Sequence, residues 1–184
     1  MSYFAPYEPR NHDARCALTG LIVRPAARHD AAALAAISAE RDGNAIEHHL
    51  RRITAEFEPS DYAQDRLLFV GEVDGAIAGL GRVTRFELPV DAPANIAPAG
   101  WYLTGVIVPV RYRRRGVGLA LTRSRLEWLA TRTDHAWYFA NAGNRATIDL
   151  HARLGFREVT RDFHFPGVTF SGGGVGVLYR GPTR

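Results

Sequence analysis

The stretch that decides the fold reads WYLTGVIVPV at Trp101–Val110 and RYRRRGVG at Arg111–Gly118. The first part is apolar and predicts a strand, whereas the second carries the glycines of a turn. The residues that follow, Leu119–Thr131, have the pattern of a helix. A strand, a glycine-containing turn and a helix in this order direct backbone N–H groups and the positive end of a helix dipole at one spot. We therefore predict a phosphate-binding loop here.

Two better-known phosphate loops do not fit this stretch. A Walker loop requires a lysine, and all 23 residues counted as Lys or Arg are arginines. A Rossmann fingerprint needs a third glycine and a later acidic residue, whereas Gly116 and Gly118 are followed by Leu119, Ala120 and Leu121. The sequence therefore excludes a Walker loop and argues against a dinucleotide site.

The spacing that fits is R-x-x-G-x-G, formed by Arg113, Gly116 and Gly118. It resembles the acetyl-CoA pyrophosphate loop of the GNAT superfamily of N-acyltransferases. The preceding Thr104–Val108 resembles the central strand of that family.

A second block supports the resemblance. Asn144–Phe156 is similar to the family's N-x-x-A-x-x-L-Y-x-x-L-G-F segment. Thr147 takes the small position, and His151 stands where tyrosine is usual. The two blocks occur in the expected order and together span Trp101 to about Phe163.

The resemblance implies an α/β fold (an α+β mixed sheet). We expect a central mixed sheet of six to seven strands, helices on both faces and splayed central strands. An irregular arm, residues 1–19, would precede a single acyltransferase domain at residues 20–184. The implied activity is transfer of the acetyl group of acetyl-CoA to a primary amine, by direct attack in a ternary complex.

The resemblance also implies a set of cofactor-binding residues. Backbone N–H groups of the loop would hold the pyrophosphate, and the Val106 N–H would lie near the thioester oxygen. Pro109 stands one position before the family's usual proline. The full set is Val106, Ile107, Val108, Arg113, Arg114, Arg115, Gly116, Val117, Gly118, Leu119, Ala120, Asn144 and His151. Asn144 is also predicted to cap its helix.

Two residues are the candidates for catalysis. His151 would be the general acid that protonates the leaving thiolate, although a histidine between two leucines of a helix also fits a packed residue. Glu87 is the candidate base, because the central strand carries no carboxylate. Five alternatives to Glu87 remain open: Glu40, Asp42, Glu47, Asp91 and Tyr102.

Composition bounds the remaining possibilities. The 184 residues are 46% apolar, which suits one core. Cys16 is the only cysteine, so no internal disulfide forms and cysteine-based metal sites are excluded. His48 and His49 point about 100° apart on a helix, so we expect a solvated surface and no metal. Without a basic leader or a long apolar run, we expect a cytoplasmic protein with no membrane partner.

Charge divides unevenly along the chain. The first 100 residues hold 10 arginines and 14 acidic residues, whereas the remaining residues hold 13 arginines and 5 acidic residues. The basic half suits an anionic cofactor. The acids of residues 25–60 and 86–100 favour a small cationic amine as acceptor; they include Asp42, Glu47, Glu56, Glu58 and Asp91. A peptide N-terminus or a lysine side chain is the alternative acceptor.

Two hypotheses from other functional classes of protein stay open. The missing strand carboxylate and the histidine in place of tyrosine also fit a non-catalytic acyl-CoA-binding sensor. A nucleic-acid-binding protein could use the arginines of residues 111–125, but it would leave the glycines unexplained, so we expect no nucleic-acid partner. An exposed sheet edge and three tryptophans are compatible with a homodimer.

Local patterns predict the other elements. Asp74-Gly75 is a strong hairpin signal between the apolar runs Arg66–Val73 and Ala76–Phe86. Asp30 is predicted to cap a helix that ends at Gly43. The remaining predicted elements are strands at 18–24, 136–140, 156–163 and 175–179, helices at 31–40 and 45–57, a helix after Asn144, and loops at 88–98 and 171–176.

Overall fold

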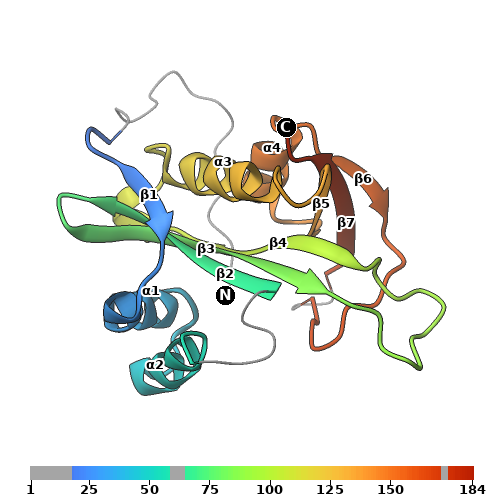
Figure 1. Ribbon diagram of the computed structural model, residues 1–184, viewed down its shortest axis with the longest axis horizontal. Helices are drawn as coiled ribbons and strands as arrows, with labels where there is room; N and C mark the ends of the chain where they lie inside the picture. The colour runs from blue at the N-terminus through green and yellow to red at the C-terminus, as the bar shows by residue number, and fades with distance from the viewer. Residues whose placement is uncertain (1–17, 59–64, 171–173) are drawn as a thin grey trace. The chain divides into compact units, whose positions relative to one another are not determined.

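The computed structural model of the chain describes residues 18–58, 65–170 and 174–184. Its strands form a seven-stranded mixed sheet in the order β1-β2-β3-β4-β5-β7-β6 (Figure 1). The strands are β1 Ile22–Pro25, β2 Arg66–Val73, β3 Ala76–Phe86, β4 Gly100–Ile107, β5 His135–Asn141, β6 Arg157–Thr160 and β7 Gly176–Pro182. The helices are α1 Ala31–Asp42, α2 Ile46–Ala55, α3 Val117–Leu129 and α4 Arg145–Ala152, with short 3₁₀ turns at Arg28–Asp30 and Val110–Tyr112. The predicted mixed α/β sheet is confirmed.

Contacts divide the chain into two units. The N-terminal unit contains the described residues up to Thr84 together with Gly105–Arg125. The C-terminal unit contains Arg85–Thr104 and Leu126–Arg184. The single domain expected at residues 20–184 stays a prediction, and the expected arm falls almost wholly outside the described residues.

The β2-β3 hairpin organises the N-terminal unit. Both strands have the bounds that the sequence predicts, and Val73 pairs with Ala76 across the turn. Asp74 and Gly75 have φ of 51° and 77°. Two left-handed residues in a two-residue loop match the twist of the flanking strands, which is why Asp-Gly predicted the hairpin correctly.

Helices cover both faces of this hairpin (Figure 1). Leu68 and Val70 of β2 and Leu80 of β3 pack against the buried residues of α1 and α2. The alternate residues of the same strands point to the opposite face, where Gly71 and Gly79 meet side chains of α3. The expectation of helices on both faces is therefore confirmed within this unit.

The C-terminal unit is built on β5, β7 and β6, which pair antiparallel in that order. On one face, Tyr102, Trp137 and Leu178 form a buried cluster with four partly buried phenylalanines. On the other face, α4 packs its His151 against Tyr138 of β5. β4 joins this unit through a parallel pairing at Tyr102 and Trp137.

Several element boundaries differ from the sequence-based expectation. The first strand begins at Ile22 and not at 18, because Gly20 has φ of 75° in a turn. The central strand ends at Ile107 and not at 110, since Pro109 lacks the N–H that a strand needs. Gly43 ends α1 with φ of 75°, as predicted.

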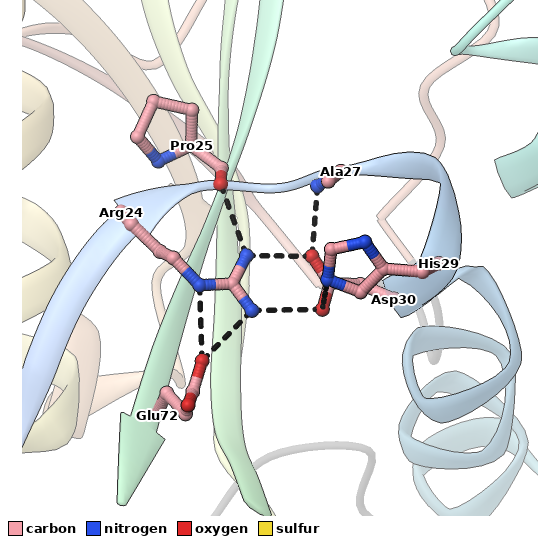
Figure 2. Close-up of polar contacts among 6 residues, drawn as sticks. All are labelled: Arg24, Pro25, Ala27, His29, Asp30 and Glu72. Atoms are coloured by element: carbon pink, nitrogen blue, oxygen red, sulfur yellow. Dashed lines mark hydrogen bonds and ion pairs between the residues drawn. The ribbon is translucent and has the colours of Figure 1, made fainter. Parts of the chain in front are cut away.

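Asp30 occupies the N-cap position of α1, as predicted, but its side chain makes no cap hydrogen bond to that helix. Its carboxylate accepts hydrogen bonds from the Ala27 N–H at 2.7 Å and from the Arg24 guanidinium at 2.7 and 2.9 Å (Figure 2). Arg24 also donates to Glu72 of β2 at 2.9 Å. This network ties β1, β2 and the turn before α1 together, and the Arg24 guanidinium holds the pKa of Asp30 below its ordinary value.

His49 also departs from expectation. It is 4% exposed, and its Nε2 lies 2.9 Å from an Asp42 carboxylate oxygen. The predicted solvated surface is therefore wrong for this histidine, which joins α1 to α2, whereas His48 is exposed.

We expect Asp30→Asn to lower the free energy of unfolding by about 2 kcal/mol near neutral pH, because a nearly buried charged pair is broken. The pKa of Asp30 is lowered in the folded state, so its contribution is complete above its ordinary pKa of 3.8 and is lost as the pH falls below it. Urea unfolding of the two proteins from pH 7 to pH 3 should therefore show a difference that shrinks in acid. Asp91→Asn, in an exposed loop, is the control; a difference that stays constant with pH would contradict the expectation.

Candidate functional site

The predicted phosphate loop lies between β4 and α3 in the N-terminal unit. Arg114 and Gly116 have φ of 62° and 89°, both in the left-handed region. Their neighbours Arg113 and Arg115 have negative φ, and a turn in which the sign of φ alternates can direct successive N–H groups toward the same side, which makes an anion-binding concavity. A Cβ on Gly116 would meet nothing within 4 Å, so this side of the loop is open.

The start of α3 adds further donors. Ala120 donates the helix-type bond to the Gly116 carbonyl at 2.9 Å. The N–H groups of Val117, Gly118 and Leu119 precede this bond and have no carbonyl within the helix to reach. They lie at the positive end of the helix dipole, so the loop and the helix start present one set of donors to an anion.

The arginines of the loop divide into different roles. Arg113 donates its Nε–H to the Val108 carbonyl at 2.9 Å and so fastens the loop to the end of β4. Arg111 pairs with Glu40 of α1 at 2.8 Å. Arg114 is exposed and Arg115 half-buried. The side chains of Arg111 and Arg113 therefore hold the loop in place, whereas the backbone supplies its donors.

Three glycines let α3 approach the hairpin closely. A Cβ on Gly79 would lie 3.0 Å from the Ile107 carbonyl oxygen and 3.0 Å from Val117. A Cβ on Gly71 would lie 3.3 Å from Val117, and one on Gly81 would lie 3.1 Å from the Arg125 side chain. Because Val117 is the first residue of α3, these glycines set the position of the helix start.

Arg125 extends the contact between α3 and the β2-β3 hairpin, next to Gly81. It is fully buried, and burial lowers its pKa. Its guanidinium donates to the carbonyls of Leu121 and Arg82 and to the Thr122 hydroxyl at 3.0 to 3.1 Å. An arginine stays protonated in proteins, so these bonds compensate a buried cation and link α3 to β3.

The middle of β4 leaves the regular strand conformation. Gly105 has φ of 58°, which only glycine adopts readily. A Cβ on Gly105 would lie 3.5 Å from the Arg82 guanidinium, and Arg82 pairs with Glu56 through two hydrogen bonds. Sequence analysis did not connect these two residues, although an arginine within the apolar strand β3 was a signal. The Arg82–Glu56 ion pair therefore lies next to Gly105, the residue before Val106 in β4.

In the C-terminal unit, α4 holds the other predicted residues. Asn144 accepts a hydrogen bond from the Thr147 N–H at 3.4 Å, so the predicted cap is confirmed. His151 Nδ1 lies 2.8 Å from the Thr147 carbonyl oxygen. A carbonyl only accepts, so Nδ1 carries a proton, and a neutral His151 keeps its lone pair on Nε2.

Aromatic rings enclose His151. Its ring stacks on Tyr138 at 3.9 Å between centroids and meets Phe156 edge-on at 5.3 Å. Tyr138 stacks in turn on Tyr179 at 4.6 Å. Only 3% of His151 is exposed, and burial raises the pKa of both tyrosines. The imidazole is therefore held in one orientation in an apolar setting.

The candidate bases are mostly engaged elsewhere. Glu87 follows β3, is 70% exposed and pairs with Arg85 at 3.3 Å. Tyr102 is buried, which raises its pKa, and it donates to the Pro98 carbonyl at 2.6 Å. Glu40 pairs with Arg111, and Asp42 pairs with His49. Within the described ranges, Glu47 and Asp91 have no ion pair.

Among the described residues, no group of three or more His, Cys, Asp or Glu side chains could hold a metal ion. None of the described helices has both the length and the apolar character needed to cross a membrane.

Comparisons with known proteins add to this geometry. The model of the acetyltransferase (GNAT) family matches residues 33–156. An N-acetyltransferase from Staphylococcus aureus Mu50 superposes with a TM-score of 0.65 and 18% identity, covering 90% of this chain and 100% of that one. The search of curated proteins found no match.

Two further solved structures share the fold. A protein from Salmonella typhimurium solved with its cofactor acetyl-CoA has a TM-score of 0.63 and 19% identity, covering 90% of this chain and 95% of that one. The ribosomal-protein-S18-alanine N-acetyltransferase of Escherichia coli has a TM-score of 0.64 and 20% identity, covering 89% and 94%. At these identities the likeness concerns the fold.

We expect Gly79→Val to lower the free energy of unfolding by about 1–3 kcal/mol, because the added side chain overlaps backbone that cannot move independently. Ala76→Val, on an exposed position of the same strand, should change stability little. Urea unfolding measures both. Equal midpoints for the two variants would show that α3 does not depend on the glycine contact.

Proposed function

This chain belongs to the GNAT family of acetyltransferases, and on that basis we propose that it transfers the acetyl group of acetyl-CoA to the nitrogen of a primary amine. Membership makes it an acetyl-CoA-dependent acetyltransferase. The nitrogen acceptor and direct attack in a ternary complex are the parts that we propose.

The observation that carries the proposal is the loop before α3. Its two left-handed residues and the N–H groups of the helix start, which have no acceptor within the helix, suit a pyrophosphate, which carries negative charge on adjacent groups. The open side at Gly116 leaves room for close approach of such a group. Residues 113–120 would hold the pyrophosphate, and the Val106 and Val108 backbone would pair with pantetheine.

The proposed transfer balances without a metal. The neutral amine attacks the thioester carbonyl, the C–N bond forms, and the C–S bond breaks. Charge that develops on the carbonyl oxygen would be stabilised by the Val106 N–H. The amine loses one proton to a base or to water, and the departing thiolate takes up another.

We assign the second proton to His151. Its Nδ1–H is held by the Thr147 carbonyl, so an imidazolium would release the proton from Nε2 and remain as the neutral tautomer that this bond favours. Stacking on Tyr138 keeps the ring in place during the transfer. The histidine can thus perform the role of the family's usual tyrosine. For the base, Glu87 remains the proposal, although its exposure and its Arg85 partner favour action through water.

The proposed amine acceptor depends on which acidic side chains are not already ion-paired. Six acids of residues 25–60 and 86–100 already pair with arginines: Asp30, Glu40, Asp42, Glu56, Glu58 and Glu87. Glu47 and Asp91 remain to attract a small cationic amine. Because so few acids remain, a peptide N-terminus is a second candidate, and two of the similar structures are ribosomal-protein-alanine N-acetyltransferases.

We expect acetyl-CoA to raise the melting temperature of the protein, because it binds only the folded state. Gly116→Ala should weaken binding about tenfold, since a left-handed alanine costs roughly 1–2 kcal/mol and the loop relaxes. Gly43→Ala is the matched control, because Gly43 has a similar φ and an equally open Cβ position. It should lower stability without changing the acetyl-CoA shift.

Thiol release then tests turnover with two acceptors, spermidine and a peptide that begins with alanine. Initial rates at varied concentrations should give intersecting lines, as direct transfer requires. Acetyl-CoA binding without turnover of any amine would favour the sensor. No shift at saturating acetyl-CoA would overturn the proposal.

We expect His151→Phe to reduce kcat at least about 100-fold, the usual contribution of a positioned acid, while the KM for acetyl-CoA stays nearly constant. Phenylalanine keeps the stacking on Tyr138 but removes the proton. His151→Tyr should restore part of kcat, because a phenol can supply a proton. Activity of His151→Phe within twofold of the parent would leave His151 with packing alone.

A further inference from the structure

The C-terminal unit carries a basic cavity that the proposed acetyl transfer does not use. Its volume is about 430 Å³, and it opens on the strands β5, β7 and β6. Its wall includes His135, Arg157 and Arg180 together with the backbone of Gly155 and Gly181. All of these residues belong to the C-terminal unit.

The strand register brings the two arginines together. Arg157 of β6 is the direct partner of Arg180 of β7, and Arg180 is the partner of Trp137 of β5. Directly opposed residues of antiparallel strands project from the same face with Cβ atoms roughly 4.5–5.5 Å apart. Like charges in that position repel and destabilise the sheet. The arrangement therefore calls for a negative charge between them.

No described residue forms a side-chain hydrogen bond or an ion pair with Arg157 or Arg180. The nearby Asp134 carboxylate has its pKa lowered chiefly by its hydrogen bond with His135, and Arg180 adds a smaller electrostatic contribution. Arg180 lies over the Trp137 ring, with its guanidinium carbon 5.8 Å from the ring centroid. The nearest acid of β6, Glu158, is held by Arg161 through two hydrogen bonds of 2.8 and 3.1 Å.

One carboxylate does line the cavity, and it is already engaged. Asp134 lies 2.6 Å from His135 Nδ1, which makes His135 the partner of this acid. The imidazole also meets Trp137 edge-on at 5.9 Å, which fixes its orientation. With Asp134 and His135 paired, the two guanidinium groups dominate the charge of the cavity.

We propose that this cavity binds the phosphate monoester group of a small molecule. A guanidinium group can donate two parallel hydrogen bonds to the oxygens of one phosphate. The two negative charges of a phosphate monoester can neutralise both arginines at once. The volume lies within the range of small-molecule sites. Val159 and Pro182 in the wall supply apolar surface for the rest of the ligand. This site shares no residue with the loop before α3, and it does not depend on the acetyltransferase proposal.

The test is a titration of the whole protein with inorganic phosphate, followed by NMR at the backbone amides of Gly155 and Gly181. The amides of Gly155 and Gly181 report on phosphate binding at the cavity. The Gly116 amide reports on phosphate binding at the loop before α3, so the two sites are followed separately. We expect saturable shifts at both cavity amides in the parent protein. Arg157→Gln should weaken the affinity about tenfold, because one charged hydrogen-bond donor is lost. The double variant Arg157→Gln and Arg180→Gln should show no saturable shift.

Three comparisons make the result decisive. Arg153→Gln removes an exposed arginine of the same unit and should bind phosphate like the parent. Both cavity variants should melt no lower than the parent in phosphate-free buffer, since a repulsive pair is removed. Saturable shifts that persist in the double variant, or that chloride reproduces at equal ionic strength, would overturn the site. Succinate binding as tightly as phosphate would overturn the assignment to a phosphate.

Discussion

The close approach of α3 to the β2-β3 hairpin is the constraint on which the N-terminal unit depends. Val117 packs over Gly71 and Gly79, and a Cβ at Gly79 would come within 3.0 Å of the Ile107 carbonyl oxygen. The strand that ends at Ile107 and the helix that begins at Val117 are therefore both located by one glycine. The loop connects the end of β4 to the start of α3. The packing of α3 on Gly79 therefore determines the direction of the loop's N–H groups. A phosphate site made of backbone needs such support, because no side chain can adjust to correct a misplaced amide.

A chain without lysine uses arginine for tasks that differ in burial. Arg125 is a buried tie between α3 and β3, and Arg24 is a half-buried link between β1, β2 and the turn before α1. Arg113 fastens the loop through a carbonyl, whereas Arg157 and Arg180 face each other across two strands. The planar guanidinium with five donors explains this range, since it can satisfy several carbonyls at once or share an anion with a neighbour. The net charge of the C-terminal half therefore does not belong to a single site. The sequence shows the excess of arginine, but only the structure distinguishes the arginines that join elements from those without an ion pair to a described residue.

Sequence analysis predicted the elements whose signals are local. Asp74-Gly75 determined the hairpin and its register, and Gly43 ended α1, because both require a left-handed backbone that few other residues tolerate. Asn144 was recognised as a cap from its place before a helix. Asp30 takes the predicted N-cap position, but its side-chain partner was missed, because an aspartate before a helix has the same local pattern whether it caps the helix or binds an arginine of a strand. His49 was misassigned for a similar reason, since its burial depends on Asp42 seven residues away. The Arg82–Glu56 pair and the opposed arginines of β6 and β7 result from long-range pairing, which no local pattern encodes.

The setting of His151 bears on the proposal that it acts as the general acid in place of a tyrosine. A buried phenol is a poor acid here, as the raised pKa of the neighbouring Tyr138 illustrates. An imidazolium is a stronger acid than a phenol by several orders of magnitude, because their ordinary pKa values are about 6.5 and 10. The Thr147 carbonyl accepts the Nδ1–H, which places the lone pair of the neutral ring on Nε2. In the proposed role of His151, the same bond would leave Nε2 to exchange the proton, and the backbone of α4 supplies the acceptor one helical turn earlier.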